Sequence, residues 1–168
     1  MKYHITPHAE IIAWCLMPNH FHWLIQVKMN YKNSIQFENR EKHINPLNRS
    51  IGSLQSSYTQ GINKKYNRSG SLFRTRTKAK SLSGHRKMRN FYGLNCFFYI
   101  HQNPIRAGLV KKMEDWQFSS FQDYAGFRDG TLCNKTLAKE LIQLPDEPKE
   151  FYKLSTETIP DKVMQKLF

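Results

Sequence analysis

The N-terminal part of the chain carries an apolar and aromatic stretch that divides into two halves. Residues 11–17 are all apolar, and residues 20–27 are rich in aromatic and branched side chains, with Pro18 and Asn19 between them. Short runs of this kind are typical of strands, and Pro-Asn is a turn signal. The pattern therefore predicts two strands joined by a turn. On the second strand, alternation predicts a core-facing set made of Phe21, Trp23, Ile25 and Val27.

Helical spacing begins after Asn45. Asn45 followed by Pro46 fits an N-cap with proline at the first helical position. We expect this helix to end at residues 67–70 and an alternating strand to follow over residues 72–82. The apolar positions of the helix are Ile51, Leu54, Tyr58, Ile62 and Tyr66, and one face of the strand carries Arg74, Arg76, Lys78 and Lys80.

A second helix is predicted from Ser83 to Asn103. Pro104 should break it or start a short new helix, because proline has no N–H to donate and its ring clashes with the preceding turn. A short helix is expected over residues 136–144, and the polar chain beyond it is expected to form a peripheral tail.

The charge of the chain is concentrated in one block. The chain has 26 Lys and Arg against 13 Asp and Glu, which gives a formal net charge of +13. Residues 42–113 contain 15 of these 26 cations and no acid. Such a block favours a polyanion such as nucleic acid as partner. It also excludes, within this block, the carboxylate clusters with which many nucleases hold two metal ions.

The remaining composition predicts an ordinary cytoplasmic protein, associated with the nucleoid when it is bound to DNA. The longest apolar run, residues 11–17, is far shorter than the about 20 residues of a membrane span, so no membrane partner is expected. The N-terminal ten residues lack the apolar stretch of a signal peptide. The three cysteines, Cys15, Cys96 and Cys133, form no CxxC pair and predict no disulfide framework.

Two pairs of residues could carry chemistry. His20 and His22 would project from the same face of a strand, close enough to share a metal ion. The alternative is that they are strand histidines held by hydrogen bonds. Tyr99 and Asn103, four residues apart, would lie on one helical face. A phenol can act as a covalent nucleophile, although a tyrosine among aromatic neighbours is commonly a core residue.

These residues lie within motifs that strongly resemble the REP-associated tyrosine transposases, which are single-tyrosine HUH transposases related to those of insertion sequences. The similarity occurs in order along residues 11–130. Its blocks are Cys-Leu-Met-Pro-Asn-His-Phe-His at 15–22, Tyr58-Thr59 with Tyr66-Asn67-Arg68, Gly-Ser-Leu-Phe-Arg at 70–74 continuing to Lys78-Ala79, Tyr-Ile-His-Gln-Asn-Pro-Ile-Arg-Ala-Gly-Leu-Val at 99–110, and Trp116 with Ser119-Ser120 and Tyr124.

The resemblance implies a role for each matching residue. His20 and His22 would be metal ligands with Asn103 as the third, for Mg²⁺ or Mn²⁺, and Tyr99 would be the nucleophile. The implied activity is metal-dependent cleavage and rejoining of single-stranded DNA at hairpin sites through a 5′-phosphotyrosine, in DNA transposition. The implied fold is of the α+β class, a ferredoxin-like antiparallel sheet with helices packed on one face.

Single-stranded or hairpin DNA is thus the expected partner. Phosphate contacts combined with base stacking hold single strands, and the basic block is also rich in Tyr and Phe. The other histidines receive no role, and His101 is expected at the surface. The predicted DNA-binding residues are Lys64, Lys65, Arg68, Arg74, Arg76, Lys78, Lys80, Arg86 and Arg106.

One departure from the family pattern keeps a second function open. Only residues 1–10 precede the first strand, so we expect the family's first strand and helix to be missing from the transposase domain, residues 1–130. Residues 131–168 are expected to form a helical, peripheral tail. A truncated transposase that binds DNA hairpins without cutting them is the alternative, and both a monomer and a homodimer are compatible with these features.

Overall fold

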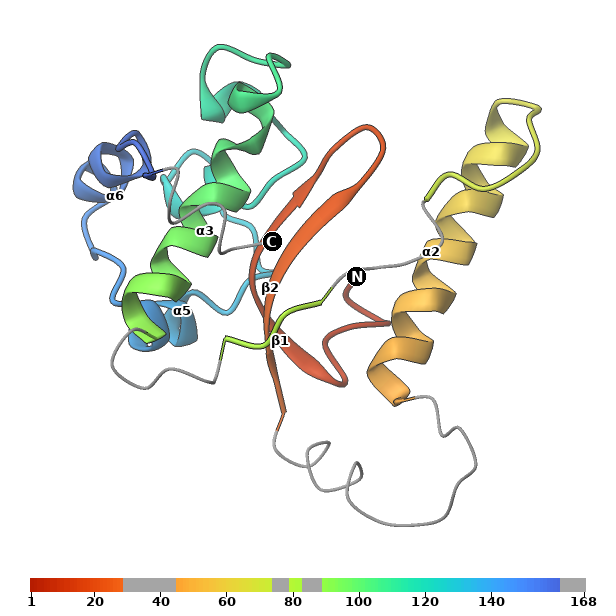
Figure 1. Cartoon of the computed structure of the whole chain (residues 1–168), viewed down its shortest axis with the longest axis horizontal. Helices are drawn as coiled ribbons and strands as arrows, with labels where there is room; N and C mark the ends of the chain where they lie inside the picture. The colour runs from red at the N-terminus through yellow and green to blue at the C-terminus, as the bar shows by residue number, and fades with distance from the viewer. Residues whose placement is uncertain (29–44, 74–78, 83–88, 161–168) are drawn as a thin grey trace. The chain divides into compact units, whose positions relative to one another are not determined.

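The structure, a computed structural model, describes residues 1–28, 45–73, 79–82 and 89–160. Two antiparallel strands and five α-helices within these residues make an α+β fold consistent with part of a ferredoxin-like fold, which confirms the predicted class. The elements are β1 (Ala9–Leu16), β2 (Phe21–Val27), α2 (Pro46–Lys65), α3 (Arg89–Arg106), the 3₁₀ turn η2 (Met113–Asp115), α4 (Phe121–Tyr124), α5 (Lys135–Ile142) and α6 (Pro148–Ser155) (Figure 1).

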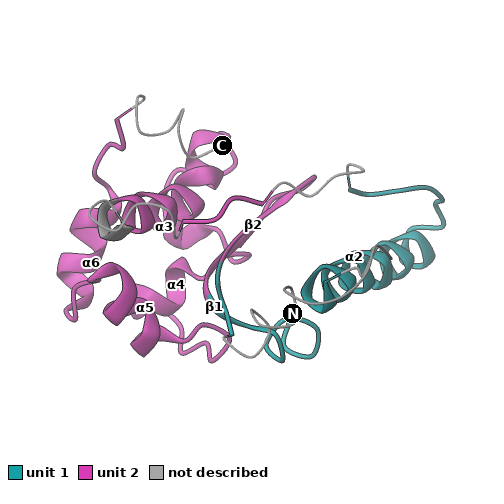
Figure 2. Cartoon of the chain, turned by 60° about the horizontal axis from the view of Figure 1, so that its bottom comes forward, with its two compact units in different colours: residues 1–11, 25–77 teal, residues 12–24, 78–168 magenta. Residues whose placement is uncertain are grey.

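The chain divides into two compact units (Figure 2). Unit 1 comprises residues 1–11 and 25–77, and unit 2 comprises residues 12–24 and 78–168. No helix in the described ranges is both long enough and apolar enough to cross a membrane.

The predicted hairpin of two strands is confirmed. β1 and β2 pair through a turn at Pro18 and Asn19, and the N–H of Met17 donates to the carbonyl of His20 at 2.8 Å. A two-residue loop of this kind fixes the register of both strands, because a slip by one residue would exchange their faces. His20 therefore has a defined position at the start of β2.

The faces of β2 differ from the prediction. Leu24, which lies on the histidine face, packs against the core cluster of unit 2. The set expected to face the core is only half-buried, and its members Phe21 and Trp23 stack on each other with ring centroids 4.3 Å apart. Alternation identified the two faces but not which one meets a helix, since both carry apolar residues.

The outer edge of β1 in unit 2 is covered by residues 116–124. The N–H of Leu16 donates to the carbonyl of Phe118 at 2.8 Å, and the N–H of Ser120 donates to that of Trp14 at 2.9 Å. Side chains complete the edge: Trp116 Nε1 donates to the carbonyl of Leu16 at 3.1 Å, and the Tyr124 hydroxyl to that of Ile12 at 2.6 Å. This segment, which ends in α4, thus satisfies backbone groups of β1 that a further strand would otherwise pair.

The core of unit 2 forms where α3 meets β1 and the C-terminal helices. Phe97 is fully buried, and its ring contacts those of His101, Tyr124 and Phe151 edge to face. Aromatic rings prefer such contacts because the positive edge of one ring faces the negative face of another.

Residues after 130 contribute to this core, contrary to the expectation of a peripheral tail. Ala138 and Ile142 of α5 and Phe151 of α6 are buried in the same cluster as Phe97. Proline and polar residues suggested a solvated segment. A helix needs apolar residues along only one side to pack on a core, and α6 has such a stripe. The domain boundary at residue 130 stays a prediction.

α3 runs through Pro104 to Arg106, so neither the break nor the new helix start predicted at this proline occurs. Proline lacks the N–H that would donate to the carbonyl of Ile100, and the helix nevertheless continues for two residues beyond it. The helix ends at Gly108, whose φ of 68° is left-handed. The N–H of Gly108 donates to Ile105 and that of Leu109 to Pro104, both at 2.9 Å, which is a Schellman motif.

Unit 1 contains α2, whose start and end were predicted correctly. The Asn45 side chain accepts a hydrogen bond from the N–H of Leu47, and Pro46 is in the first turn. Asn67, with a φ of 47°, lies just past the end of α2. The strand predicted over residues 72–82 has its middle outside the described residues, and its described ends, 72–73 and 79–82, are not in a strand.

Candidate functional site

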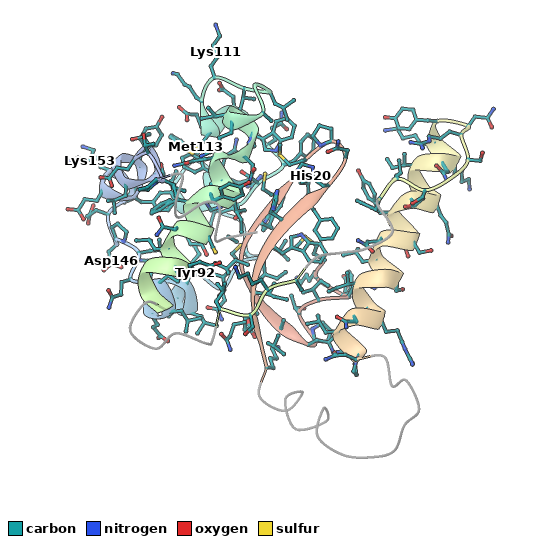
Figure 3. All side chains as sticks on the ribbon, viewed as in Figure 1. His20, Tyr92, Lys111, Met113, Asp146 and Lys153 are labelled. Atoms are coloured by element: carbon teal, nitrogen blue, oxygen red, sulfur yellow. The ribbon has the colours of Figure 1, made fainter. Side chains whose placement is uncertain are left out.

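The histidine pair lies at the turn end of the β1–β2 hairpin, where His20 is labelled (Figure 3). The rings of His20 and His22 have centroids 4.9 Å apart and are nearly perpendicular. Because residues two apart in a strand share a face, the two imidazoles point to the same side, as the HxH spacing predicted.

His22 is held neutral by its surroundings. Burial, with a smaller contribution from the charge of His20, lowers the pKa of His22 from 6.5 to about 4. A neutral imidazole has a lone pair that can bind a metal ion at physiological pH. His20 is exposed, and its Nδ1 lies 2.6 Å from Oδ1 of Asn19. Because a carboxamide oxygen can only accept, we assign the proton to Nδ1, which leaves Nε2 of His20 as the basic nitrogen.

Tyr99 of α3 lies next to this pair. Its ring is perpendicular to that of His22, with centroids 5.9 Å apart. The Nδ2 of Asn103, one turn further along α3, donates to the carbonyl of Tyr99 at 2.9 Å. The structure thus brings His22 next to Tyr99 within unit 2, and Asn103 bonds to the backbone of Tyr99 on the same helix.

A cation completes the surroundings of Tyr99. The guanidinium carbon of Arg106 lies 5.6 Å from the centroid of the Tyr99 ring. Arg106 is exposed and follows Tyr99 by seven residues, two turns of α3, so both side chains lie on one face. A guanidinium here can bind a phosphate that approaches the phenol.

The metal ligands predicted from the sequence are two imidazoles and one amide, His20, His22 and Asn103. Within the described ranges, no group of three or more His, Cys, Asp or Glu side chains could hold a metal. Asn103 is 8% exposed, and because its Nδ2 is engaged by Tyr99, its Oδ1 is the atom that can face a cation. Imidazole ligands suit Mn²⁺ or Zn²⁺ better than Mg²⁺ because they are softer than oxygen ligands.

The predicted DNA-binding residues are only partly within the described chain. Lys64, Lys65 and Arg68 are exposed in unit 1. In unit 2, the Lys80 ammonium lies 5.6 Å from the ring centroid of Tyr92 on α3. The others, Arg74, Arg76, Lys78 and Arg86, lie outside the described residues.

His101 is buried, which corrects its expected place at the surface. It is 1% exposed, and its Nε2 lies 2.7 Å from Oγ of Ser120. That hydroxyl also accepts from the N–H of Trp14 at 3.0 Å and donates to the carbonyl of Trp14 at 3.2 Å. This pattern fits the tautomer with the proton on Nε2, so His101 ties the tyrosine helix to β1.

Sequence reasoning missed this connection because its signal is three-dimensional. His101 lies two residues from both Tyr99 and Asn103, and on a helix a residue two positions away points to another side. The adjacent serines 119 and 120 were part of the recognised motif, but nothing local indicated that Ser120 reaches a histidine. Complete desolvation lowers the pKa of His101 to about 3.

These features define an α+β protein with a histidine pair on a hairpin strand and a tyrosine beside it on a helix. No family model matches the chain, and no solved structure gives a significant match. The chain is similar to a Haemophilus influenzae protein named "Putative REP-associated tyrosine transposase", with 27% identity over 117 residues. The match covers 67% of this chain and 58% of that protein, so the chain spans little more than half of its relative.

Proposed function

We propose that this chain is a transposase of the REP-associated tyrosine type, which cleaves and rejoins single-stranded DNA at hairpin sites through Tyr99. The observation that carries the proposal is the contact of the His22 ring with the Tyr99 ring at 5.9 Å between centroids. The name of the Haemophilus relative supports the same class.

The proposed reaction is an exchange of one phosphodiester bond for another. The phenol oxygen of Tyr99 attacks phosphorus and loses its proton to solvent. The bond from phosphorus to the 3′ oxygen breaks, and that oxygen leaves with the electron pair and takes up a proton as a 3′-hydroxyl. The phosphate stays on the 5′ carbon as a phosphotyrosine ester. A second 3′-hydroxyl can reverse the step, and no ATP is needed because the bond is conserved.

The neighbouring residues position and neutralise the reacting groups. A divalent ion held by His20, His22 and Asn103 would supply Lewis-acid polarisation of the scissile phosphate. Arg106, beside the Tyr99 ring, is suited to hold a non-bridging phosphate oxygen. The hydrogen bond from Asn103 Nδ2 to the carbonyl of Tyr99 holds the Asn103 side chain against the turn of α3 that carries the proposed nucleophile. The basic residues of the acid-free block would bind the DNA backbone.

The test is trapping of the covalent intermediate. The protein is incubated with Mn²⁺ and an end-labelled DNA hairpin that carries a short single-stranded flank, and adducts are separated on a denaturing gel. We expect an adduct with the parent protein and none with Tyr99→Phe, which lacks only the nucleophilic oxygen. His22→Ala should reduce adduct formation by about 100-fold or more, since even the loss of a residue that only hydrogen-bonds to a metal ligand commonly costs about 10- to 100-fold.

Tyr92→Phe is the matched control, because Tyr92 lies on the same helix and also contacts a cation, Lys80. It should form the adduct at the parent rate. An adduct that persists in Tyr99→Phe would contradict the nucleophile assignment. Tight hairpin binding by the parent protein with no adduct under any divalent ion would favour the non-catalytic hairpin-binding protein instead.

A further inference from the structure

The chain that follows α2 folds back along the last turns of the helix (Figure 1). The N–H of Arg68 donates to the carbonyl of Asn63, and Asn63 Nδ2 donates to the carbonyl of Gly70, both at 2.9 Å. The rings of Tyr58 and Phe73 then meet with centroids 5.9 Å apart. We call residues 58–73 the α2 lobe. It lies wholly within unit 1, whereas Tyr99 lies in unit 2.

The lobe presents two large aromatic side chains to solvent. Tyr58 is 52% exposed and Tyr66 is 61% exposed. Leu47, at the other end, is the buried residue of α2, so these tyrosines do not anchor the helix to a core. Both rings are therefore accessible to a ligand from solvent.

The charge of the lobe identifies the chemistry of its partner. Lys64, Lys65 and Arg68 are exposed, and the ammonium of Lys65 lies 5.3 Å from the centroid of the Tyr66 ring. No acid occurs anywhere in residues 42–113, so nothing within the lobe neutralises these cations. Exposed rings interleaved with cations fit a strand whose bases are unpaired and whose backbone is anionic.

We propose that the α2 lobe binds single-stranded DNA by stacking unpaired bases on Tyr58 and Tyr66, while its three cations hold the adjacent phosphates. The identity of the ligand rests on the proposed function, but the lobe belongs to a different unit from the reacting tyrosine. The two tyrosines are eight residues apart, which corresponds to about 12 Å along a helix, so they contact separate bases. The lobe would thus recognise the single-stranded flank of a hairpin and not its paired stem.

The test measures binding without cleavage. Tyr58→Leu and Tyr66→Leu are each made in the Tyr99→Phe protein, and affinities are measured by fluorescence anisotropy for a labelled single strand and for the same strand fully paired. Each substitution should weaken single-strand binding roughly 5- to 100-fold, the loss of one stacked base, and change duplex binding less than twofold. Tyr58→Phe and Tyr66→Phe keep a ring and should restore the affinity.

Tyr3→Leu is the matched control, because Tyr3 belongs to unit 1, is 89% exposed and lies outside the lobe. The affinity of the Tyr3→Leu protein for the single strand should equal that of the parent. Unchanged single-strand binding in both leucine variants, with a native circular dichroism spectrum, would overturn the proposal. An equal loss for single strand and duplex, or a change of oligomeric state in light scattering, would overturn it too. None of these results depends on adduct formation by Tyr99, so failure of the catalytic proposal remains distinguishable.

Discussion

His101 lies two residues from Tyr99, on a different side of α3, and is fully buried among aromatic rings. Its bond to Ser120 joins the helix that carries the proposed nucleophile to the strand that leads into the histidine pair. A buried imidazole stays neutral because its charged form would lose its hydration. One residue therefore makes both the geometry of the site and the stability of unit 2 sensitive to acid.

This burial predicts an acid-sensitive contribution to stability. The pKa of His101 is about 3 in the folded chain and near 6.5 when unfolded, so its contribution is fully present above pH 6.5 and declines as the pH falls below it. Between pH 7 and pH 5 the free energy of unfolding should fall by about 2 kcal/mol on this account. Urea titrations at the two pH values measure the loss. His101→Gln cannot titrate and should show a loss smaller by that amount; an identical loss in both proteins would contradict the assignment.

A second prediction at this scale concerns Arg128. Asp123 is buried, and Arg128 Nη2 donates to its Oδ2 at 3.0 Å while also donating to the carbonyl of Ser119 at 2.7 Å. Removing the guanidinium would leave a buried carboxylate unpaired, so Arg128→Gln should lower the unfolding free energy by about 3 kcal/mol. The added Asp123→Asn substitution removes the charge and should recover part of this loss. A double variant as unstable as the sum of the single changes would contradict the coupling.

Among the elements, residues 116–124 stabilise the hairpin by completing the outer edge of β1. The Tyr124 hydroxyl donates to the carbonyl of Ile12, and burial raises the pKa of Tyr124 above its ordinary value. Tyr124→Phe leaves that carbonyl without this donor, so the free energy of unfolding should fall by about 1–2 kcal/mol. Thermal unfolding followed by circular dichroism provides the measurement. Tyr3→Phe, which alters an exposed hydroxyl, should have no effect, and equal stability of Tyr124→Phe and the parent would contradict the account.

The end of α3 gives another prediction at the element scale. Gly108 adopts a left-handed φ of 68°, with open space where a Cβ would lie, so only backbone strain opposes a side chain. Gly108→Ala should therefore destabilise the chain by about 1 kcal/mol. Gly52→Ala lies inside α2, also in open space, and should be neutral or stabilising because alanine favours the helix. Urea unfolding measures the stability of both variants. A Gly108→Ala protein more stable than the Gly52→Ala protein would contradict the assigned backbone strain at Gly108.

The elements that the sequence predicted correctly are those with local signals. Pro18-Asn19 specifies a turn, and Asn45-Pro46 specifies a helix start, because each acts through its own backbone. The HxH spacing and the four-residue spacing of Tyr99 and Asn103 likewise place side chains on shared faces. The burial of His101, the core role of Phe151 and the incomplete burial of Phe21 depend on partners distant in the chain. No local pattern encodes those partners, so these three were not predictable.

For the whole molecule, the central prediction concerns charge. The net charge of +13 arises within residues 42–113, so DNA binding should weaken steeply with salt. Each phosphate contact contributes about 0.7 to the slope of log affinity against log salt for a single strand, so the double variant Lys64→Gln with Lys65→Gln should lower the slope by roughly 1.4. Anisotropy titrations at several salt concentrations give the slope.

The matched control removes the same charge elsewhere. Lys149 and Lys153 are exposed on α6, outside the basic block, and Lys153 is labelled in Figure 3. Their double substitution by glutamine should leave the slope unchanged. Equal slopes for the two double variants would mean that net charge alone, and not the basic block, governs binding.

The most direct test of the account identifies the residue that becomes linked to DNA. The adduct formed with Mn²⁺ and a hairpin is digested with nuclease and trypsin, and the modified peptide is sequenced by mass spectrometry. We expect a nucleotide attached through its 5′-phosphate to the Tyr99 oxygen, together with a free 3′-hydroxyl on the released strand. A modification on any other residue, or a 3′-linked nucleotide, would contradict it.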